Sequence, residues 1–206
     1  MKNLVKICGI TTIEEIEFIN EAKPDFAGFV LFVSKSKRNI SVEQAKKLLE
    51  NLDSQIKSVA VTISPDERKL QMIEEAGFDY VQIHGAISSA LLDKTKIPVI
   101  KAFNVGDLSE YEIYHNHSNV AGYVFDAQVP GSGKEFDWTL LEQIPRDEKF
   151  ALLAGGLNPS NVKKAISVTK IHGADTSSGV ENENGIGKDR NKILKFVKCV
   201  RETDKE

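Results

Sequence analysis

The 206-residue sequence lacks most of the features that place a protein outside the cell or in a membrane. It has two cysteines, Cys8 and Cys199, too few for the disulfide framework of a secreted protein of this length. No apolar run reaches the roughly 18 residues of a membrane helix, and no signal-peptide pattern precedes the first apolar segment at Leu4. These absences predict a cytoplasmic protein that does not contact a membrane.

An excess of charge of one sign is also absent. The formal net charge is -3, although 28% of the residues are charged. A nucleic-acid-binding protein usually carries a strongly basic surface, so we expect no nucleic-acid partner. A local cluster of basic residues that binds the phosphate of a small molecule is compatible with this charge.

Short apolar runs alternate with segments of helical periodicity along the whole chain. Buried parallel strands are nearly continuous runs of Val, Ile, Leu and Phe, and eight such runs are present. They cover residues 4–8, 26–32, 58–63, 80–83, 99–103, 122–125, 150–154 and 171–175. Eight strand-helix units predict an α/β fold, a single (β/α)8 TIM barrel, forming one catalytic domain over residues 1–206.

Helix start signals support this alternation. Thr12 is a candidate cap for a helix over 13–22. Ser41, followed three residues later by Gln44, resembles a capping box that opens the next helix. The last amphipathic helix is predicted over 189–201, and Cys199 is expected to pack there.

An open, doubly wound sheet is the alternative fold, because periodicity alone does not reveal whether a sheet closes. No strand-turn-helix segment carries the G-x-G-x-x-G pattern of dinucleotide-binding sheets, and such sheets have about six strands. The eight predicted strands therefore favour the closed barrel.

Polar residues stand at the carboxyl ends of the predicted strands, where barrels build their sites. Barrels frequently bind phosphate with the loops after strands seven and eight, through backbone N–H groups. Glycines let an anion approach the backbone, and serine hydroxyls add donors. The candidate phosphate-binding residues are Gly155, Gly156, Ser177, Ser178 and Gly179. The alternative is that the glycines only form a tight turn and the serines cap a helix.

Cys8 and Asp126 end the first and the sixth strand and are the candidate catalytic pair. A thiol becomes a base near neutral pH if nearby cations lower its pKa, and Lys6 lies on the same strand face. Asp126 follows bulky apolar residues, and partial burial would raise its pKa toward the range of a general acid. The alternatives are a core cysteine and a carboxylate that caps a loop.

Three further residues occupy similar positions. Arg38 lies in a basic loop after strand two and is suited to binding a carboxylate or a phosphate, although such loops are often simply solvated. His84 follows strand four and is expected to donate to a substrate or to support a loop. Asp175, at the end of strand eight, competes with Asp126, but its neighbours indicate loop organisation.

No metal site is expected. The four histidines, His84, His115, His117 and His172, form no ligand set at the strand ends. We expect His115 and His117 to be exposed.

Five segments together carry a specific resemblance. They are residues 5–11 (VKICGIT), 81–85 (VQIHG), Asp126 with 131–138 (GSGKEFDW), 153–159 (LAGGLNP) and 175–181 (DTSSGVE). In this order they resemble the signature segments of phosphoribosylanthranilate isomerases, enzymes of tryptophan biosynthesis. Two positions depart from the family pattern: the loop after strand six has fewer glycines, and Asn39 follows Arg38 where an aromatic residue is common.

The resemblance implies an Amadori rearrangement of N-(5-phosphoribosyl)anthranilate to 1-(2-carboxyphenylamino)-1-deoxyribulose 5-phosphate. It implies that Asp126 is the general acid that opens the ribose ring and that Cys8 is the general base that removes the C2 proton. Arg38 would hold the anthranilate carboxylate, and the glycine and serine loops would bind the 5-phosphate. No metal or organic cofactor is implied, the only expected partner is the small phosphoribosyl substrate, and relatives include monomers and homodimers.

Two functions of other classes remain open at this point. A sugar-phosphate epimerase on the same barrel would need metal ligands or a second carboxylate opposite the first. A phosphate-binding protein without catalysis would keep the two loops and leave Cys8 in the core.

Overall fold

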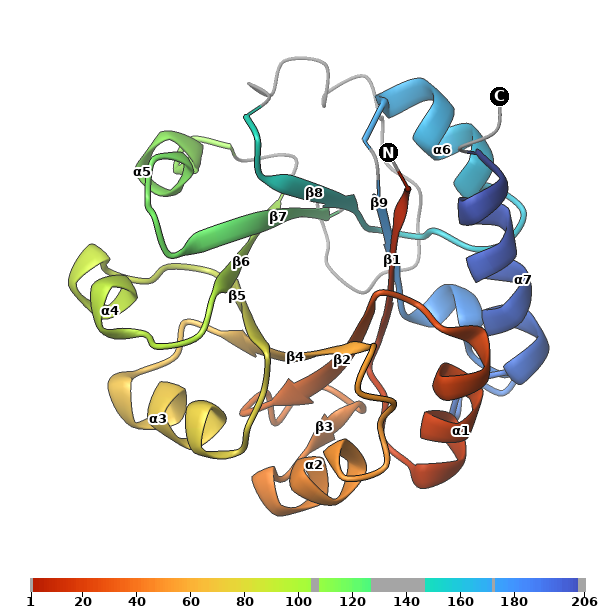
Figure 1. Ribbon diagram of the computed structural model, residues 1–206, viewed down its shortest axis with the longest axis horizontal. Coiled ribbons are helices and arrows are strands. Elements are labelled where there is room, and N and C mark those ends of the chain that lie inside the picture. Colours follow the sequence, from red (N-terminus) through yellow and green to blue (C-terminus); the bar gives the residue numbers. More distant parts are fainter. Residues whose placement is uncertain (1, 105–107, 127–146, 172, 204–206) are drawn as a thin grey trace.

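The computed structural model describes residues 2–104, 108–126, 147–171 and 173–203. Eight parallel strands form a closed ring with the helices outside it (Figure 1). The strands are β1 (Leu4–Cys8), β2 (Phe26–Leu31), β4 (Lys57–Ile63), β5 (Tyr80–His84), β6 (Val99–Asn104), β7 (Val120–Asp126), β8 (Phe150–Leu153) and β9 (Gly173–Thr176). The ring closes because β1 pairs with β9 on one side and with β2 on the other. The predicted TIM barrel is confirmed, and the alternative of an open sheet is excluded.

The helices follow the strands in chain order. They are α1 (Ile13–Ala22), α2 (Val42–Leu49), α3 (Glu67–Glu75), α4 (Ser89–Lys94), α5 (Tyr111–His115), α6 (Val162–Thr169) and α7 (Arg190–Glu202). A 3-10 turn, η2 (Ser178–Val180), follows β9, and a two-residue strand, β3 (Asn39–Ile40), pairs with the carboxyl end of β2. Within the described residues no helix has the length and apolarity needed to cross a bilayer.

The predicted helix caps are largely confirmed. The Thr12 hydroxyl accepts from the Glu15 N–H, and the Glu15 side chain accepts from the Thr12 N–H, so α1 begins with a complete capping box. Ser41 caps α2 by accepting from the Gln44 N–H. The Gln44 side chain donates to the Thr11 carbonyl instead of returning to Ser41, so this second box is only half formed.

The eighth strand begins later than predicted. The sequence predicts it over residues 171–175, but β9 pairs with β1 only from Gly173 to Thr176. The Ile171 N–H donates to the Thr169 hydroxyl at the end of α6, which keeps Ile171 with the helix.

Two apolar layers hold the barrel. The larger cluster lies between the strands and the helices, and the smaller one fills the barrel interior. Phe26, Tyr80 and Phe150, the first residues of β2, β5 and β8, pack against one another with ring centroids 5.4 to 6.4 Å apart. These rings fill the amino-terminal end of the interior, so the space for a ligand lies at the carboxyl end.

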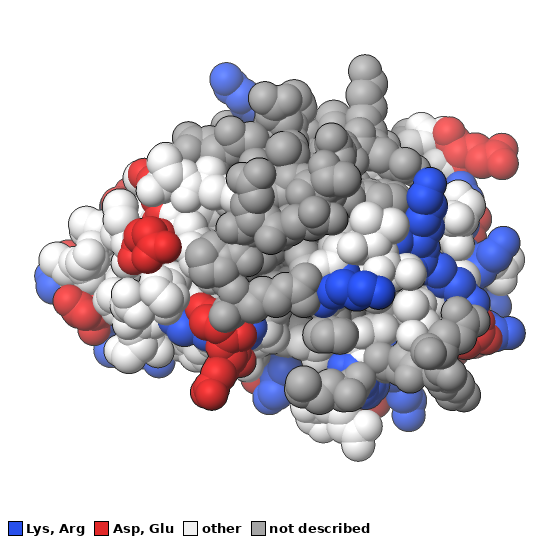
Figure 2. All heavy atoms as spheres, turned by 90° about the horizontal axis from the view of Figure 1, so that it is seen from above, with Lys and Arg blue, Asp and Glu red and all other residues white. Residues whose placement is uncertain are grey.

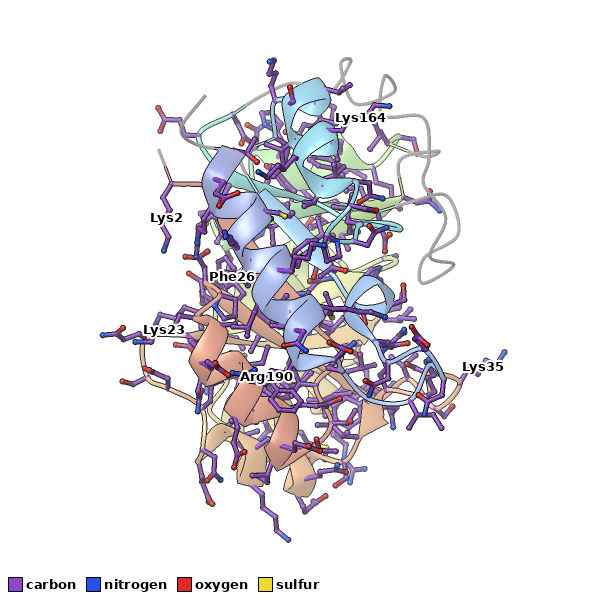
Figure 3. The ribbon with its side chains drawn as sticks, turned by 90° about the vertical axis from the view of Figure 1, so that its right-hand side faces the viewer. Lys2, Lys23, Phe26, Lys35, Lys164 and Arg190 are labelled. Carbon is purple, nitrogen blue, oxygen red and sulfur yellow. The ribbon has the colours of Figure 1, made fainter. Side chains whose placement is uncertain are left out.

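The two ends of the barrel are separated in the side view. Lys2 and Lys23, which precede β1 and β2, lie at one end, and Lys35 from the loop after β2 lies at the other (Figure 3). Acidic and basic side chains both occur on the face shown in Figure 2. The described residues on that face therefore do not form the single-sign basic surface of a nucleic-acid-binding protein.

Lys101 is a buried cation on the outer side of β6. It is 2% exposed, and its Nζ donates to the Ala102 carbonyl at 2.8 Å. The same atom lies 4.7 Å from the ring centroid of Phe103 and 4.8 Å from that of Tyr114. Burial lowers the pKa of Lys101 to about 8 from 10.5.

We predict that Lys101→Met stabilises the protein at pH 7. Between about pH 8 and pH 10.5 the unfolded state binds more protons at this position, so the cost of the buried charge is complete below pH 8 and disappears as the pH rises. The free energy of unfolding should increase by about 2 kcal/mol at pH 7. This is less than the full cost of burying the ammonium, because the substitution also removes the contacts of Lys101 with the aromatic rings. Urea unfolding at pH 7 and pH 10 measures it. A difference between variant and wild type that is the same at both pH values would refute the prediction.

Candidate active site

A cavity of about 220 Å³ lies at the carboxyl ends of the strands. It brings together all the predicted site residues except Gly179: Cys8, Arg38, His84, Asp126, Gly155, Gly156, Asp175, Ser177 and Ser178. Val30, Val33, Val61, Ile63 and Leu157 contribute apolar walls. Cys8 and Asp126 thus line one cavity, and the glycine pair lies at the same end of the barrel.

The chain turns sharply where β1 ends. Gly9 follows Cys8 with φ 81°, in the left-handed region that glycine adopts without steric cost. A Cβ at this position would lie 2.4 Å from Cδ of Arg38 and 3.0 Å from Oγ of Ser177. Gly9 therefore lets Arg38 and Ser177 approach the strand end that carries Cys8.

Beneath Cys8 lies a buried ion pair. Lys6 is fully buried, and its Nζ donates to Oδ2 of Asp175 at 2.9 Å. The two residues are register partners on β1 and β9. Burial raises the pKa of Asp175, and Lys6 opposes that rise.

The pKa of Cys8 lies above its ordinary value of 9.0. Burial is the main cause and Asp175 adds to it, while the ammonium groups of Lys6 and Lys188 act in the opposite direction. Lys6 has the predicted sign of effect, but the expectation of a lowered thiol pKa is wrong because desolvation outweighs it. In the protein without substrate, Cys8 is mainly a thiol at neutral pH.

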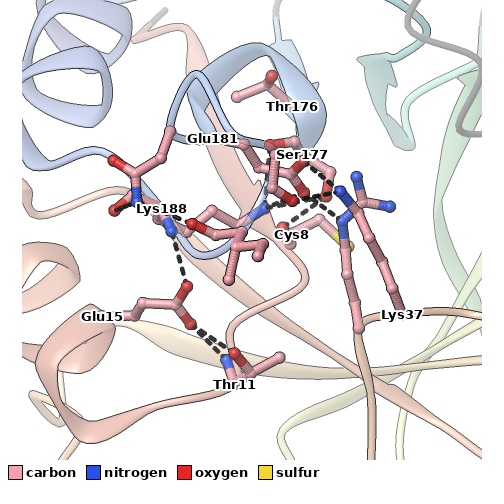
Figure 4. Close-up of polar contacts among 12 residues, drawn as sticks. Cys8, Thr11, Glu15, Lys37, Thr176, Ser177, Glu181 and Lys188 are labelled. Carbon is pink, nitrogen blue, oxygen red and sulfur yellow. Dashed lines mark hydrogen bonds and ion pairs between the residues drawn. The ribbon is translucent and has the colours of Figure 1, made fainter.

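Arg38 is fixed by a residue that the sequence pattern does not reveal. Its Nε donates to Oε1 of Glu181 at 2.6 Å, and Nζ of Lys37 donates to Oε2 at 2.8 Å (Figure 4). Burial raises the pKa of Glu181, but Arg38, Lys37 and Lys188 together bring it below its usual value. Asn39, where the family pattern differs, accepts from the Val33 N–H at 2.7 Å and closes the loop that carries Arg38.

Lys188 and Glu15 are likewise not evident from the sequence. Nζ of Lys188 donates to the carbonyl and the hydroxyl of Ser177 at 2.9 and 3.1 Å, and its N–H donates to Glu15 (Figure 4). The other carboxylate oxygen of Glu15 binds Thr11. This network ties the start of α1 to the loop after β9.

The two candidate phosphate loops are held against each other. The Thr176 hydroxyl donates to the Leu157 carbonyl at 2.6 Å, and a Cβ at Gly179 would lie 1.9 Å from that oxygen. Gly179 is therefore required for packing between the loops and does not itself line the cavity. The Ser177 hydroxyl donates to the Cys8 carbonyl at 2.8 Å rather than into the cavity.

Backbone amides of these loops are available for a ligand. Gly155 and Gly156 have φ of 94° and 67°, so the chain doubles back beside the cavity. The N–H groups of Gly155, Gly156 and Ser178 donate no hydrogen bond to any described residue. Adjacent unpaired N–H groups form a concave site that favours an anion.

His84 is neutral at physiological pH. Its Nε2 lies 2.9 Å from Nε2 of Gln82, so its acceptor role there places the proton on Nδ1. Burial, together with the positive charges of Lys6 and Lys101, lowers the pKa of His84 to about 4.

The remaining polar candidates lie outside the site. His115 and His117 are half-buried rather than exposed, and they approach Asp147 and Asp93. Cys199 packs on α7 as predicted, with its Sγ 3.5 Å from the Pro159 carbonyl. Among the described residues, no three His, Cys, Asp or Glu side chains are grouped to hold a metal ion. His172 and segment 131–138 lie outside the described residues.

We predict that Cys8 alkylates slowly at neutral pH. In a Cys199→Ser background Cys8 is the only thiol. Its rate of reaction with iodoacetamide should rise with pH, and the midpoint of that titration should lie above pH 9, because burial disfavours the thiolate. Quenched time points analysed by mass spectrometry give the rates. A midpoint near pH 7 would show that the cations dominate instead.

The family model described as "PRAI: N-(5'phosphoribosyl)anthranilate (PRA) isomerase" matches residues 5–199. The chain is 37% identical to N-(5'-phosphoribosyl)anthranilate isomerase of Acetivibrio thermocellus, an alignment that covers 97% of this chain and 96% of the relative. It is 39% identical to the enzyme of the same name from Thermoanaerobacter pseudethanolicus, with 96% and 97% covered.

Solved structures agree with these sequence matches. Phosphoribosyl anthranilate isomerase from Thermotoga maritima superimposes with a TM-score of 0.82 at 36% identity, over 97% of this chain and 99% of that one. A phosphoribosyl anthranilate isomerase in complex with reduced 1-(o-carboxyphenylamino)-1-deoxyribulose 5-phosphate gives 0.80 at 34% identity, with the same coverage.

Proposed function

The chain belongs to the N-(5'-phosphoribosyl)anthranilate isomerase family, and we propose that Cys8 and Asp126 are the general base and the general acid of its reaction. The enzyme carries out the Amadori rearrangement of N-(5-phosphoribosyl)anthranilate to 1-(2-carboxyphenylamino)-1-deoxyribulose 5-phosphate in tryptophan biosynthesis. The assignment of individual residues rests on the geometry of the cavity.

The first step opens the ribose ring. Asp126, the last residue of β7, gives its proton to the ring oxygen, the bond between C1 and that oxygen breaks, and the nitrogen lone pair forms the Schiff base. The carboxylate left behind is half-buried at the cavity wall.

The second step moves the C2 proton. The Cys8 thiolate takes it, the electron pair of the C2–H bond forms a double bond between C1 and C2, and the imine nitrogen accepts the displaced pair. The resulting enolamine tautomerises to the ketose as C1 gains a proton and the C2 hydroxyl loses its own. The raised pKa of Cys8 makes the thiolate scarce but strongly basic, which suits the removal of a weakly acidic proton.

One observation carries this proposal: Cys8, Asp126 and the unpaired amides of the two loops line the same cavity. A 5-phosphate on the N–H groups of Gly155, Gly156 and Ser178 would fix one end of the sugar. Cys8 and Asp126 come from strands that β8 and β9 separate, so they can act at different positions of the ribose.

The other predicted site residues bind substrate in this proposal. Arg38, held at Nε by Glu181, offers its remaining N–H groups to the anthranilate carboxylate. His84 is neutral and presents a polar edge to the cavity. Oδ1 of Asp175 is buried with no hydrogen-bond partner among the described residues, so a substrate hydroxyl can satisfy it. Ser177 and Gly179 shape the phosphate loop.

The partner proposed is a small phosphoribosyl substrate, with no nucleic acid and no membrane. The steps above are proton transfers, and they use no metal or organic cofactor. We propose a single cytoplasmic domain over residues 1–206, acting as a monomer or a homodimer. A related enzyme from Thermotoga maritima is described as dimeric.

We predict that Cys8→Ser and Asp126→Asn each lower turnover at least about 100-fold, the size of a lost acid or base. The loss of anthranilate-substrate fluorescence, followed on purified protein without added metal, measures the rate. Cys199→Ser is the matched control and should keep wild-type turnover. Wild-type rates in folded Cys8→Ser would remove the base assignment and favour a silent phosphate binder.

A further inference from the structure

Lys6 is a buried charge that the acid and base steps above do not use. It is fully buried and does not line the cavity, whereas its two polar neighbours, Cys8 and Asp175, do. Its ammonium group therefore lies behind the cavity wall, out of reach of a substrate but beside the proposed base.

The geometry places the ammonium and the thiol in the same small space. A Cβ added at Gly28 would lie 2.9 Å from Sγ of Cys8 and 3.1 Å from Nζ of Lys6. Gly28 is the register partner of Cys8 on β2, so its missing side chain provides the space that both atoms occupy. Any larger residue there would crowd both groups.

Asp175 keeps this charge inside the protein. A lysine buried without an anionic partner tends to lose its proton, because desolvation penalises the ammonium. Burial lowers the pKa of Lys6, but the negative charges of Asp175 and of ionised Cys8 outweigh it, so its pKa is raised. Lys6 is therefore a cation whenever Asp175 and Cys8 are ionised.

Other charged groups face Cys8 from the neighbouring elements. They are Asp175 on β9, Lys188 after η2, Arg38 after β2, and, lining the same cavity, His84 on β5 and Asp126 on β7. Lys188 also opposes the effect of burial on the thiol, but its Nζ is taken up by Ser177. Among the cations, Lys6 has the larger effect on Cys8.

We propose that Lys6 is a positioning residue for the isomerase reaction: its ammonium, held by Asp175 in the space beside Gly28, stabilises the thiolate form of Cys8. The proposal rests on the role of Cys8 as the base. Lys6 keeps its proton throughout, while the thiolate takes the C2 proton and later returns a proton to the sugar or to solvent. The partially buried base thus has a fixed counter-charge and does not rely on water.

The test uses Cys8 as its own reporter. In the Cys199→Ser background, Lys6→Met removes the ammonium and keeps an unbranched side chain. Lys6→Met leaves the Asp175 carboxylate buried without its partner, which can prevent folding. The double variant Lys6→Met with Asp175→Asn removes both charges and is used if the single variant fails to fold. Lys101→Met is the matched control, since it removes a buried strand lysine outside the site.

Loss of an opposite charge at this range raises a pKa by about one to three units, so the iodoacetamide rate at pH 8 should fall about tenfold or more. We expect this fall in Lys6→Met, with a comparable fall in kcat/KM, and no change in the Lys101→Met control. In the double variant the loss of Asp175 offsets part of the effect, so the alkylation rate should still fall, but by less. Circular dichroism verifies that each variant is folded.

Two outcomes would contradict the account and are distinguishable. If folded Lys6→Met, or the folded double variant where the single variant does not fold, alkylates at the parent rate or faster, Lys6 does not set the state of the thiol. The inference then fails while Cys8 can still be the base. If alkylation slows but kcat/KM is unchanged, Lys6 acts on the thiol but Cys8 is not the base, and the proposed function of Cys8 fails.

Discussion

The seam between β1 and β9 is the constraint on which the rest of this structure depends. The pairing of these two strands closes the barrel. It also brings Lys6 beside Asp175, although the two residues are 169 positions apart in the chain. A buried ion pair of this kind contributes little net stability, because desolvation offsets the attraction, but breaking one partner is costly. At this seam the pair lies directly behind the proposed catalytic thiol. The strand pairing that closes the barrel therefore also places the Lys6 ammonium beside the proposed base.

The rim of the cavity is built on a second set of charges. Glu181 binds Arg38 and Lys37, and Lys188 binds Ser177, so the loops after β2 and β9 are held together by polar contacts. Inside this rim the walls are largely apolar, and electrostatic interactions are stronger there than in water. The site thus combines fixed cations for an anionic substrate with a poorly solvated space in which protons are transferred.

Position along the chain is enough to predict the fold and most of the site. Strand runs, caps such as Thr12 and the polar strand ends are local patterns, and they suffice to single out Cys8, Asp126 and the glycine loops. Glu181, Lys188 and Glu15 escape prediction because their partners lie far away in sequence, and only barrel closure brings them together. The sign of the effect of Lys6 is predictable, but the direction of the Cys8 pKa is not, because burial depends on the packed structure. The late start of β9 has the same origin, since Ile171 is held by the end of α6.

The most direct measurement is a crystal structure of this enzyme with the reduced product analogue that a related isomerase binds. We predict the phosphate on the amides of Gly155, Gly156 and Ser178, with Sγ of Cys8 about 3.5 Å from C2 of the ribulose chain. Asp126 should lie on the side of the former ring oxygen. A phosphate bound elsewhere, or a Cys8 side chain turned away from C2, would contradict the assignment of base and acid.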